Sequence, residues 1–164
     1  DLRLLLAPRH VERAGEIESL VRGRGFDCLL RSEQKPPSNP DAVIVLDTMG
    51  ELSRLYALAD YVFIGKSLIG WGGQNPLEAA AMGCPIVFGP HMENFREAES
   101  VLLENEGAVR VSTAEELEQT LRKWLNDPGL CHALGEKSLQ ALQSRQGATG
   151  RNAQLISGYL NQEG

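Results

Sequence analysis

The chain has 164 residues, of which 42% are hydrophobic and 23% are charged, and its formal net charge is −6. This composition is typical of a globular protein, and the length suffices for one domain with a sizeable core. The negative charge disfavours nucleic acid or an anionic membrane surface as the main partner, because both attract basic faces. The three cysteines show no CxxC spacing, which favours buried thiols in a reducing compartment over disulfides or a zinc site.

The chain begins at Asp1 and has no apolar run near the ~20 residues that a membrane-spanning helix needs. We therefore expect a soluble fragment of a longer protein. Short apolar runs along the chain predict buried strands at Leu2–Ala7, Phe26–Leu30, Ala42–Leu46, Tyr61–Ile64, Pro85–Phe88 and Ala108–Val111. The segments between them predict helices over 11–22, 49–60, 75–82 and 93–107. After Thr113, an N-cap with Glu116 three residues later, the chain reads as helix to Leu160, interrupted near 127–129 and at Gly147.

This alternation of strands and helices indicates a parallel sheet that is covered on both faces by helices. We expect α/β architecture, a Rossmann-like doubly wound sheet with a helical C-terminal tail, in a single domain over 1–164. Ligands of such sheets bind where the strands end and the helices begin. The informative segments are therefore the loops at 8–10, 47–51, 65–78 and 89–95, which are rich in glycine and polar residues.

The loop "GWGGQNPLE" at 70–78 has the properties of an anion site. Its glycines allow positive φ and leave the backbone bare, so that a ligand can approach the main chain. Asn75 stands at an N-cap position before Pro76, and the free amides of a helix start attract anions. Arg9 adds a bidentate donor for a phosphate, and His10 a further donor. These residues predict a pocket for a phosphorylated ligand, in particular a nucleotide. The sequence contains no GxxxxGK[ST] P-loop, and no GxGxxG follows the first strand.

Structural explanations stand beside the functional ones. Asn75 and Glu78 could form only a capping box, and Arg9 with His10 could be a solvated loop. Asp47 is expected to cap or turn the chain after its strand, and Trp71 to pack its loop. His91 could equally hydrogen-bond a helix end or bind a ligand. The residues alone thus lead to a domain that binds a nucleotide or a phosphorylated sugar, without a catalytic machine of its own.

Four ordered motifs give a more specific indication. "APRH", "DTMGEL", "GGQNPLEAAAMGCPIVFGP" and "HMENFRE" resemble the carboxyl-terminal half of the 3-deoxy-D-manno-octulosonic acid (Kdo) transferases. The resemblance implies a GT-B glycosyltransferase of lipopolysaccharide biosynthesis. Such enzymes move Kdo from CMP-Kdo to lipid A precursor with inversion and without a metal or other cofactor. They act at the cytoplasmic side of the bacterial inner membrane. Their amino-terminal domain contacts this membrane and binds the acceptor.

By this resemblance the carboxyl-terminal domain holds the nucleotide-sugar donor. The implied donor-binding residues are Pro8, Arg9, His10, Met49, Gly50, Glu51, Gly72, Gly73, Gln74, Asn75 and Glu78. Arg9 would meet the donor phosphate, and Glu78 would hold the ribose hydroxyls. Gln74 replaces a histidine of the family, so a proton-donating role at this position is not expected. The general base belongs to the amino-terminal domain, and we expect this chain to bind donor without turning it over.

Two alternatives remain open from the sequence. The chain could be the donor half of another GT-B transferase that uses a UDP- or GDP-sugar. Many retaining members of that group carry a glutamate eight residues before the position of Glu78, where this chain has Gly70. The other alternative is a non-catalytic nucleotide-binding module.

Overall fold

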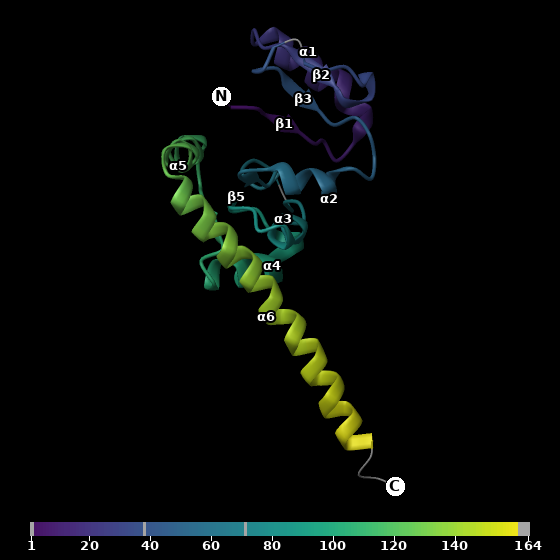
Figure 1. The fold of residues 1–164 in the computed structure, drawn as a ribbon, viewed down its shortest axis with the longest axis vertical. Helices are drawn as coiled ribbons and strands as arrows, with labels where there is room; N and C mark the ends of the chain where they lie inside the picture. The colour runs from purple at the N-terminus through teal and green to yellow at the C-terminus, as the bar shows by residue number, and fades with distance from the viewer. Residues whose placement is uncertain (1, 38, 71, 161–164) are drawn as a thin grey trace. The chain divides into compact units, whose positions relative to one another are not determined.

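The computed structural model describes residues 2–37, 39–70 and 72–160, with side chains up to residue 144. The chain divides into two compact units, Asp1–Leu55 and Tyr56–Gly164, and each is described by itself (Figure 1). The single domain over 1–164 stays a prediction. Trp71, which we expect to pack its loop, lies outside the described residues.

The first unit is a small parallel sheet with one covering helix. Strands β1 (Leu5–Leu6), β2 (Cys28–Leu30) and β3 (Val43–Val45) pair in the order β1-β3-β2. Helix α1 (Ala14–Gly23) follows a 3₁₀ turn and packs Ala14 against Cys28 and Val45. Because side chains alternate along a strand, this arrangement buries one face of the sheet under α1. Helix α2 (Leu52–Leu55) ends the unit.

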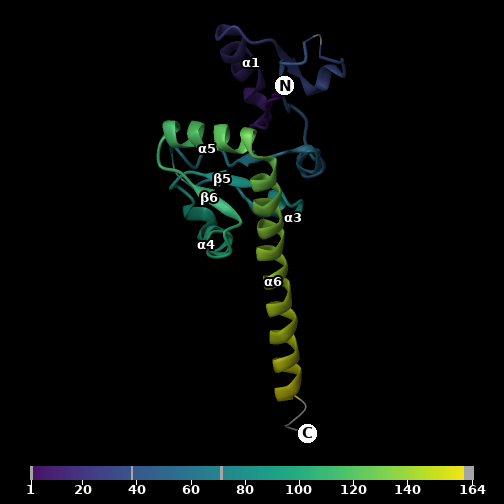
Figure 2. The same ribbon diagram turned by 60° about the vertical axis from the view of Figure 1, so that its left-hand side comes forward.

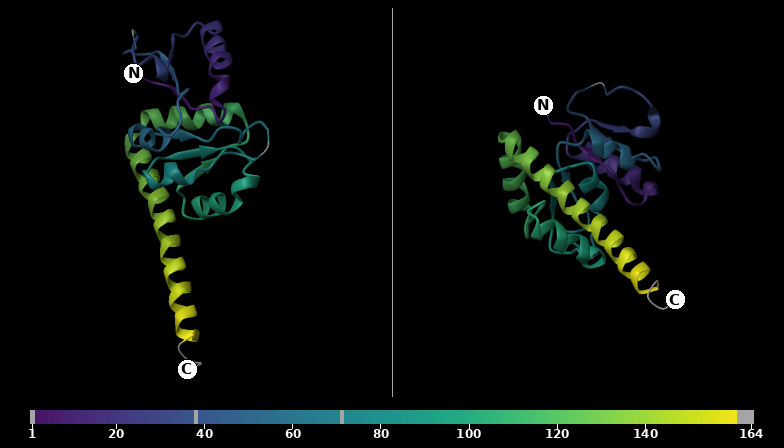
Figure 3. Two further views of the ribbon diagram at one scale, coloured as in Figure 1. Left: turned by 90° about the vertical axis from the view of Figure 1, so that its right-hand side faces the viewer. Right: turned by 60° about the horizontal axis from the view of Figure 1, so that its bottom comes forward.

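The second unit is a three-layer structure. Strands β4 (Val62–Phe63), β5 (Ile86–Phe88) and β6 (Ala108–Arg110) are parallel, in the order β4-β5-β6. Ile86 and Phe88 belong to a core with α3 (Leu77–Ala81) and α4 (Arg96–Glu104), whereas Val87 packs with Trp124 of α5 (Ala114–Asn126). Figures 2 and 3 show α5 on one face of this sheet and α4 on the other. Strand β5 is therefore covered on both faces, as expected for a doubly wound sheet.

Two C-terminal helices complete this unit. Thr113 caps α5 by accepting the amide of Glu116 at 3.2 Å, as predicted, and the Glu116 carboxylate accepts the Ser112 amide at 2.6 Å. The helical region breaks after Asn126, also as predicted, and α6 (Pro128–Leu160) follows. The expected break at Gly147 is wrong, because the backbone of α6 continues through it. The second half of α6 extends beyond the helices that its first half contacts (Figure 1).

Helix α6 approaches the end of α3 closely because residue 135 is a glycine. A Cβ at Gly135 would collide with the backbone oxygen of Gly83. Three residues on, the buried Ser138 hydroxyl donates to the backbone oxygen of Cys84 at 2.9 Å. Among the described residues, no helix is both long and apolar enough to cross a membrane.

The predicted α/β class with parallel strands is confirmed. All predicted strands form, each shorter than or equal to its predicted range, and they pair as two three-stranded sheets. The lengths of the helices in the middle of the chain were overestimated. The segment 49–60 holds only α2 and a 3₁₀ turn at Tyr56–Leu58, and α3 begins two residues after Asn75. Cys28 and Cys84 are buried free thiols as expected, and Cys131 is a half-buried free thiol.

Candidate nucleotide-binding site

In the first unit, two of the predicted loops lie at the same edge of the sheet. Pro8, Arg9 and His10 follow β1, and the segment 47–51 follows β3, its parallel neighbour. The backbone amide of Leu46 donates to Leu6 at 2.8 Å, which brings the two strand ends side by side. The His10 ring contacts Glu12 at 3.3 Å and is well exposed. Arg9 is exposed at the same edge, where its guanidinium can meet an anion.

The third strand end at this edge supplies residues that the sequence reasoning missed. Arg31 follows β2 and donates from Nε to the Glu51 carboxylate at 3.0 Å. Ser32 donates its backbone amide to Asp47 at 2.8 Å and its hydroxyl to the other carboxylate oxygen. These hydrogen bonds from Ser32 lower the pKa of Asp47. Both residues stand directly after a predicted strand, which is the signal that could have found them.

Asp47 and Glu51 therefore have partners other than the expected ones. Asp47 ties the end of β3 to the end of β2 through Ser32. Glu51 is paired with Arg31, so its charge is partly balanced by a neighbouring cation. Met49 and Gly50 remain exposed between them, and Gly50 has a φ of 82°. This is the left-handed region that glycine adopts without strain.

In the second unit, the loop between β4 and α3 carries the other predicted residues. The Asn75 side chain accepts the amide of Leu77, the first residue of α3, at 3.0 Å. The N-cap position itself falls on Pro76, one residue later than predicted. Glu78 is exposed in the first turn of α3, and Gln74 is half-buried. Because α3 has only 5 residues, its macrodipole is small and any attraction for an anion comes mainly from the local amides.

The two glycines ahead of Gln74 have a structural requirement of their own. Gly72 and Gly73 are buried with φ values of 100° and 57°. A Cβ on Gly72 would collide with the side-chain nitrogen of Asn94, and one on Gly73 would lie 3.0 Å from the backbone oxygen of His91. The bare backbone that the sequence suggested for a ligand is thus also needed for packing against the segment 91–94.

Glu93 holds this glycine turn and is a second residue that the sequence reasoning missed. Its Oε2 accepts the backbone amide of Gly72 at 2.9 Å, and its Oε1 lies 3.3 Å from Nδ1 of His91. Hydrogen bonds from the backbone amide of Glu93 itself, from Gly72 and from His91 lower the pKa of Glu93. His91 therefore meets a carboxylate, rather than the helix end that we considered. Glu93 begins a 3₁₀ turn, and nothing local in the sequence indicates its partner 21 residues away.

Ser67 connects the loops that follow β4 and β5. Its side chain is fully buried; the hydroxyl donates to the backbone oxygen of Ile64 and accepts the amide of Gly89 at 2.8 Å. The backbone oxygen of Ser67 accepts the amide of His91 at 2.9 Å. The segments 64–70 and 88–95 are thereby joined through Ser67.

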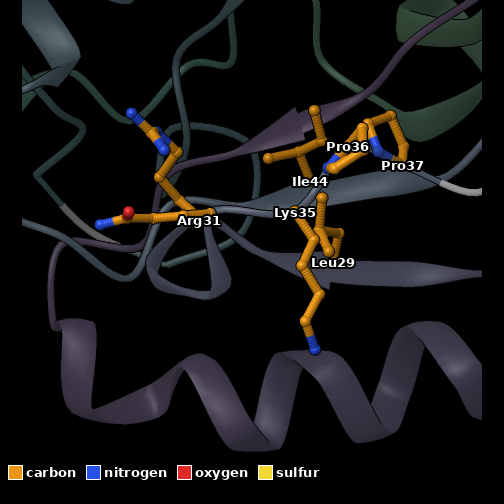
Figure 4. Close-up of a pocket in the computed structure, with 7 residues that line it drawn as sticks. Leu29, Arg31, Lys35, Pro36, Pro37 and Ile44 are labelled. Atoms are coloured by element: carbon orange, nitrogen blue, oxygen red, sulfur yellow. The ribbon is translucent and has the colours of Figure 1, made fainter.

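An open hollow of about 490 Å³ lies in the first unit. Its lining residues are Leu29, Arg31, Gln34, Lys35, Pro36, Pro37 and Ile44. In Figure 4 the apolar members lie together and the Arg31 side chain lies to one side. None of the predicted donor-binding residues is among them. The described residues contain no group of three or more His, Cys, Asp or Glu side chains placed to hold a metal ion.

Comparison with known proteins relates this arrangement to an enzyme family. No protein-family model matches the chain. A 3-deoxy-D-manno-octulosonic acid transferase from Haemophilus influenzae is 37% identical over 161 residues, which are 98% of this chain and 38% of that protein. The chain is a relative of the Kdo transferases. A second transferase of this name, from Bordetella pertussis, is 31% identical over 158 residues, 96% of this chain and 37% of its own length.

A solved structure gives the corresponding part of such a protein. The crystal structure of the C-terminal CMP-Kdo binding domain of WaaA from Acinetobacter baumannii matches with a TM-score of 0.78 and 28% identity. The match covers 85% of this chain and 72% of that domain. The chain thus spans somewhat over a third of the length of the Kdo transferases that it matches. The structural match is to the C-terminal domain of one such protein.

Proposed function

We propose that this chain is the donor-binding part of a Kdo transferase and binds CMP-Kdo. The observation that carries the proposal is the likeness, over 85% of the chain, to a C-terminal CMP-Kdo binding domain. The motifs at 8–10, 47–51 and 72–78 support it, because they supply an exposed cation, glycine-rich backbone and carboxylates close to strand ends. A UDP- or GDP-sugar is the competing ligand class, and the experiment below separates it.

The proposed roles of individual residues are those that the resemblance to the Kdo transferases implies. Arg9 donates to the phosphate, and the exposed backbone at Met49 and Gly50 accommodates the nucleotide. Asn75 and the amides near it add donors, and the Glu78 carboxylate accepts the ribose hydroxyls. As the bond to Kdo breaks, negative charge grows on the leaving CMP. Removing one donor to such a developing charge typically costs about 3 kcal/mol of barrier.

For the whole enzyme we propose transfer of Kdo to lipid A precursor at the cytoplasmic side of the inner membrane. The acceptor and the general base would come from an amino-terminal domain, since this chain corresponds to 38% of its relative from Haemophilus influenzae. The isolated chain is then expected to bind the donor without transferring Kdo.

Calorimetric titration of CMP, UDP and GDP into the purified chain tests the donor class. We expect CMP to bind more tightly than the other two. Losing a hydrogen bond to a charged group costs about 1.5–3 kcal/mol, so Arg9→Ala should weaken CMP binding by roughly 10- to 100-fold. Glu78→Ala should also weaken it, through the ribose. Arg122→Ala is the matched control, because Arg122 is an exposed cation of α5 paired with Glu118.

The outcomes distinguish the alternatives. Tighter binding of UDP or GDP would assign the chain to another group of GT-B transferases. Equal CMP affinity in wild type and Arg9→Ala would remove Arg9 from the site. No binding of any nucleotide by the folded wild type would refute the proposal.

A further inference from the structure

We propose that Glu93 is a positioning residue for donor binding: its carboxylate fixes the shape of the Gly72–Gly73 turn that precedes Asn75. This inference rests on the proposed function for its consequence, and on the contacts of Glu93 for its mechanism. Glu93 is not among the residues that the motifs assign to the donor.

The carboxylate of Glu93 is hydrogen-bonded to the backbone of the glycine turn. One oxygen takes the Gly72 amide at 2.9 Å, and the other faces Nδ1 of His91 at 3.3 Å. The side chain is 19% exposed, so these contacts lie largely out of solvent. A charged acceptor in such a setting makes a stronger hydrogen bond than a neutral one.

The turn has no side chains of its own to hold it. Gly72 and Gly73 carry no Cβ, and glycine loses more conformational freedom on ordering than any other residue. Their positive φ values place them against Asn94 and Met92, which come from the same segment as Glu93. That segment is anchored below, because Met92 is 1% exposed and the His91 amide is bonded to the buried Ser67.

Glu93 is therefore a polar link between an anchored segment and the glycine turn. The backbone leaving this turn leads within two residues to Asn75, whose side chain accepts the amide of Leu77 at the start of α3. A change of direction at Gly72 would move the amides that precede α3. The carboxylate could instead act as a competitor, by occupying an amide that an incoming phosphate needs. The two roles predict opposite effects when the carboxylate is removed.

The first measurement is hydrogen exchange of the Gly72 amide in the full chain, followed by NMR without ligand. Glu93→Ala should exchange about 10-fold faster or more, as expected when a charge-assisted hydrogen bond is lost. Glu93→Gln keeps an acceptor oxygen at the same distance and should retain most of the protection. Glu93→Asp keeps the charge but is one methylene shorter, and should resemble Glu93→Ala. Glu136→Ala in α6 is the control for the removal of an exposed carboxylate.

The second measurement is CMP titration of the same variants. We expect Glu93→Ala and Glu93→Asp to weaken CMP binding by about 10-fold, and Glu93→Gln to restore it to within about 3-fold of wild type. Tighter CMP binding by Glu93→Ala would overturn the positioning role in favour of competition. Unchanged Gly72 exchange in Glu93→Ala would overturn it as well. If wild type binds no CMP, both the proposed function and the role of Glu93 in donor binding are refuted. The exchange data then still decide whether Glu93 holds the turn.

Discussion

The buried Ser67 hydroxyl offers a direct test of how the second unit is held together. Ser67→Ala removes an acceptor from the Gly89 amide and a donor from the Ile64 oxygen, while changing the side-chain volume little. Ser67 is 0% exposed, so water does not replace these partners in the folded state. An unsatisfied buried polar group costs about 1–3 kcal/mol, and we expect a loss of about 2 kcal/mol in the free energy of unfolding.

Urea unfolding followed by tryptophan fluorescence measures this loss, because Trp124 is buried in the same unit and lies 6.0 Å from the Tyr61 ring. At an m-value of about 2 kcal/mol/M, a loss of about 2 kcal/mol lowers the midpoint by roughly 1 M. Ser100→Ala is the control: its hydroxyl bonds to Glu104 on the surface of α4, and we expect a change within about 0.5 kcal/mol. If Ser67→Ala unfolds at the same urea concentration as Ser100→Ala, the reasoning about Ser67 is wrong.

Two further changes test packing and electrostatics elsewhere. Gly135→Ala should lower the stability of the second unit by about 1–3 kcal/mol, because its Cβ meets the backbone oxygen of Gly83. Gly129→Ala, in the same helix but in ordinary contact, should be neutral or stabilising in the same urea assay; equal midpoints would exclude the close approach. Asp47→Asn should destabilise the first unit more at pH 7 than at pH 3. The hydrogen bonds from Ser32 lower the folded-state pKa of Asp47 below its ordinary value. The stability that the ionised carboxylate contributes is therefore fully present above the unfolded-state pKa, and it is lost as the pH falls through the folded-state pKa. Denaturation of both proteins at pH 7 and pH 3 measures this, and a difference independent of pH would contradict it.

The strands and the helix boundaries with strong caps were predictable because their signals are local. Strand β5 is an apolar run of three residues that are all buried, and Thr113 precedes α5 as an ordinary N-cap. Side-chain partners were not predictable, because they depend on which strand ends become neighbours. Arg31 and Glu51 meet only because β2 and β3 pair in parallel, and no spacing in the sequence encodes that distance.

The glycine turn shows why one residue pattern can have two explanations. The sequence indicated bare backbone at Gly72 and Gly73, and the positive φ values agree with that interpretation. The structure adds a second requirement, since the segment 91–94 leaves no room for a Cβ at either position. Substitutions there would disturb packing and binding together, so Arg9 is a better probe of ligand contact.

The hydrogen bonds of Ser67 also have a dynamic consequence. Because one buried residue joins the chain after β4 to the chain after β5, neither loop can detach without breaking the same set of bonds. Both loops should therefore open in one cooperative event, with amide protection that rises and falls together along 64–70 and 88–95. A ligand that stabilises either loop would then slow the opening of its neighbour without touching it.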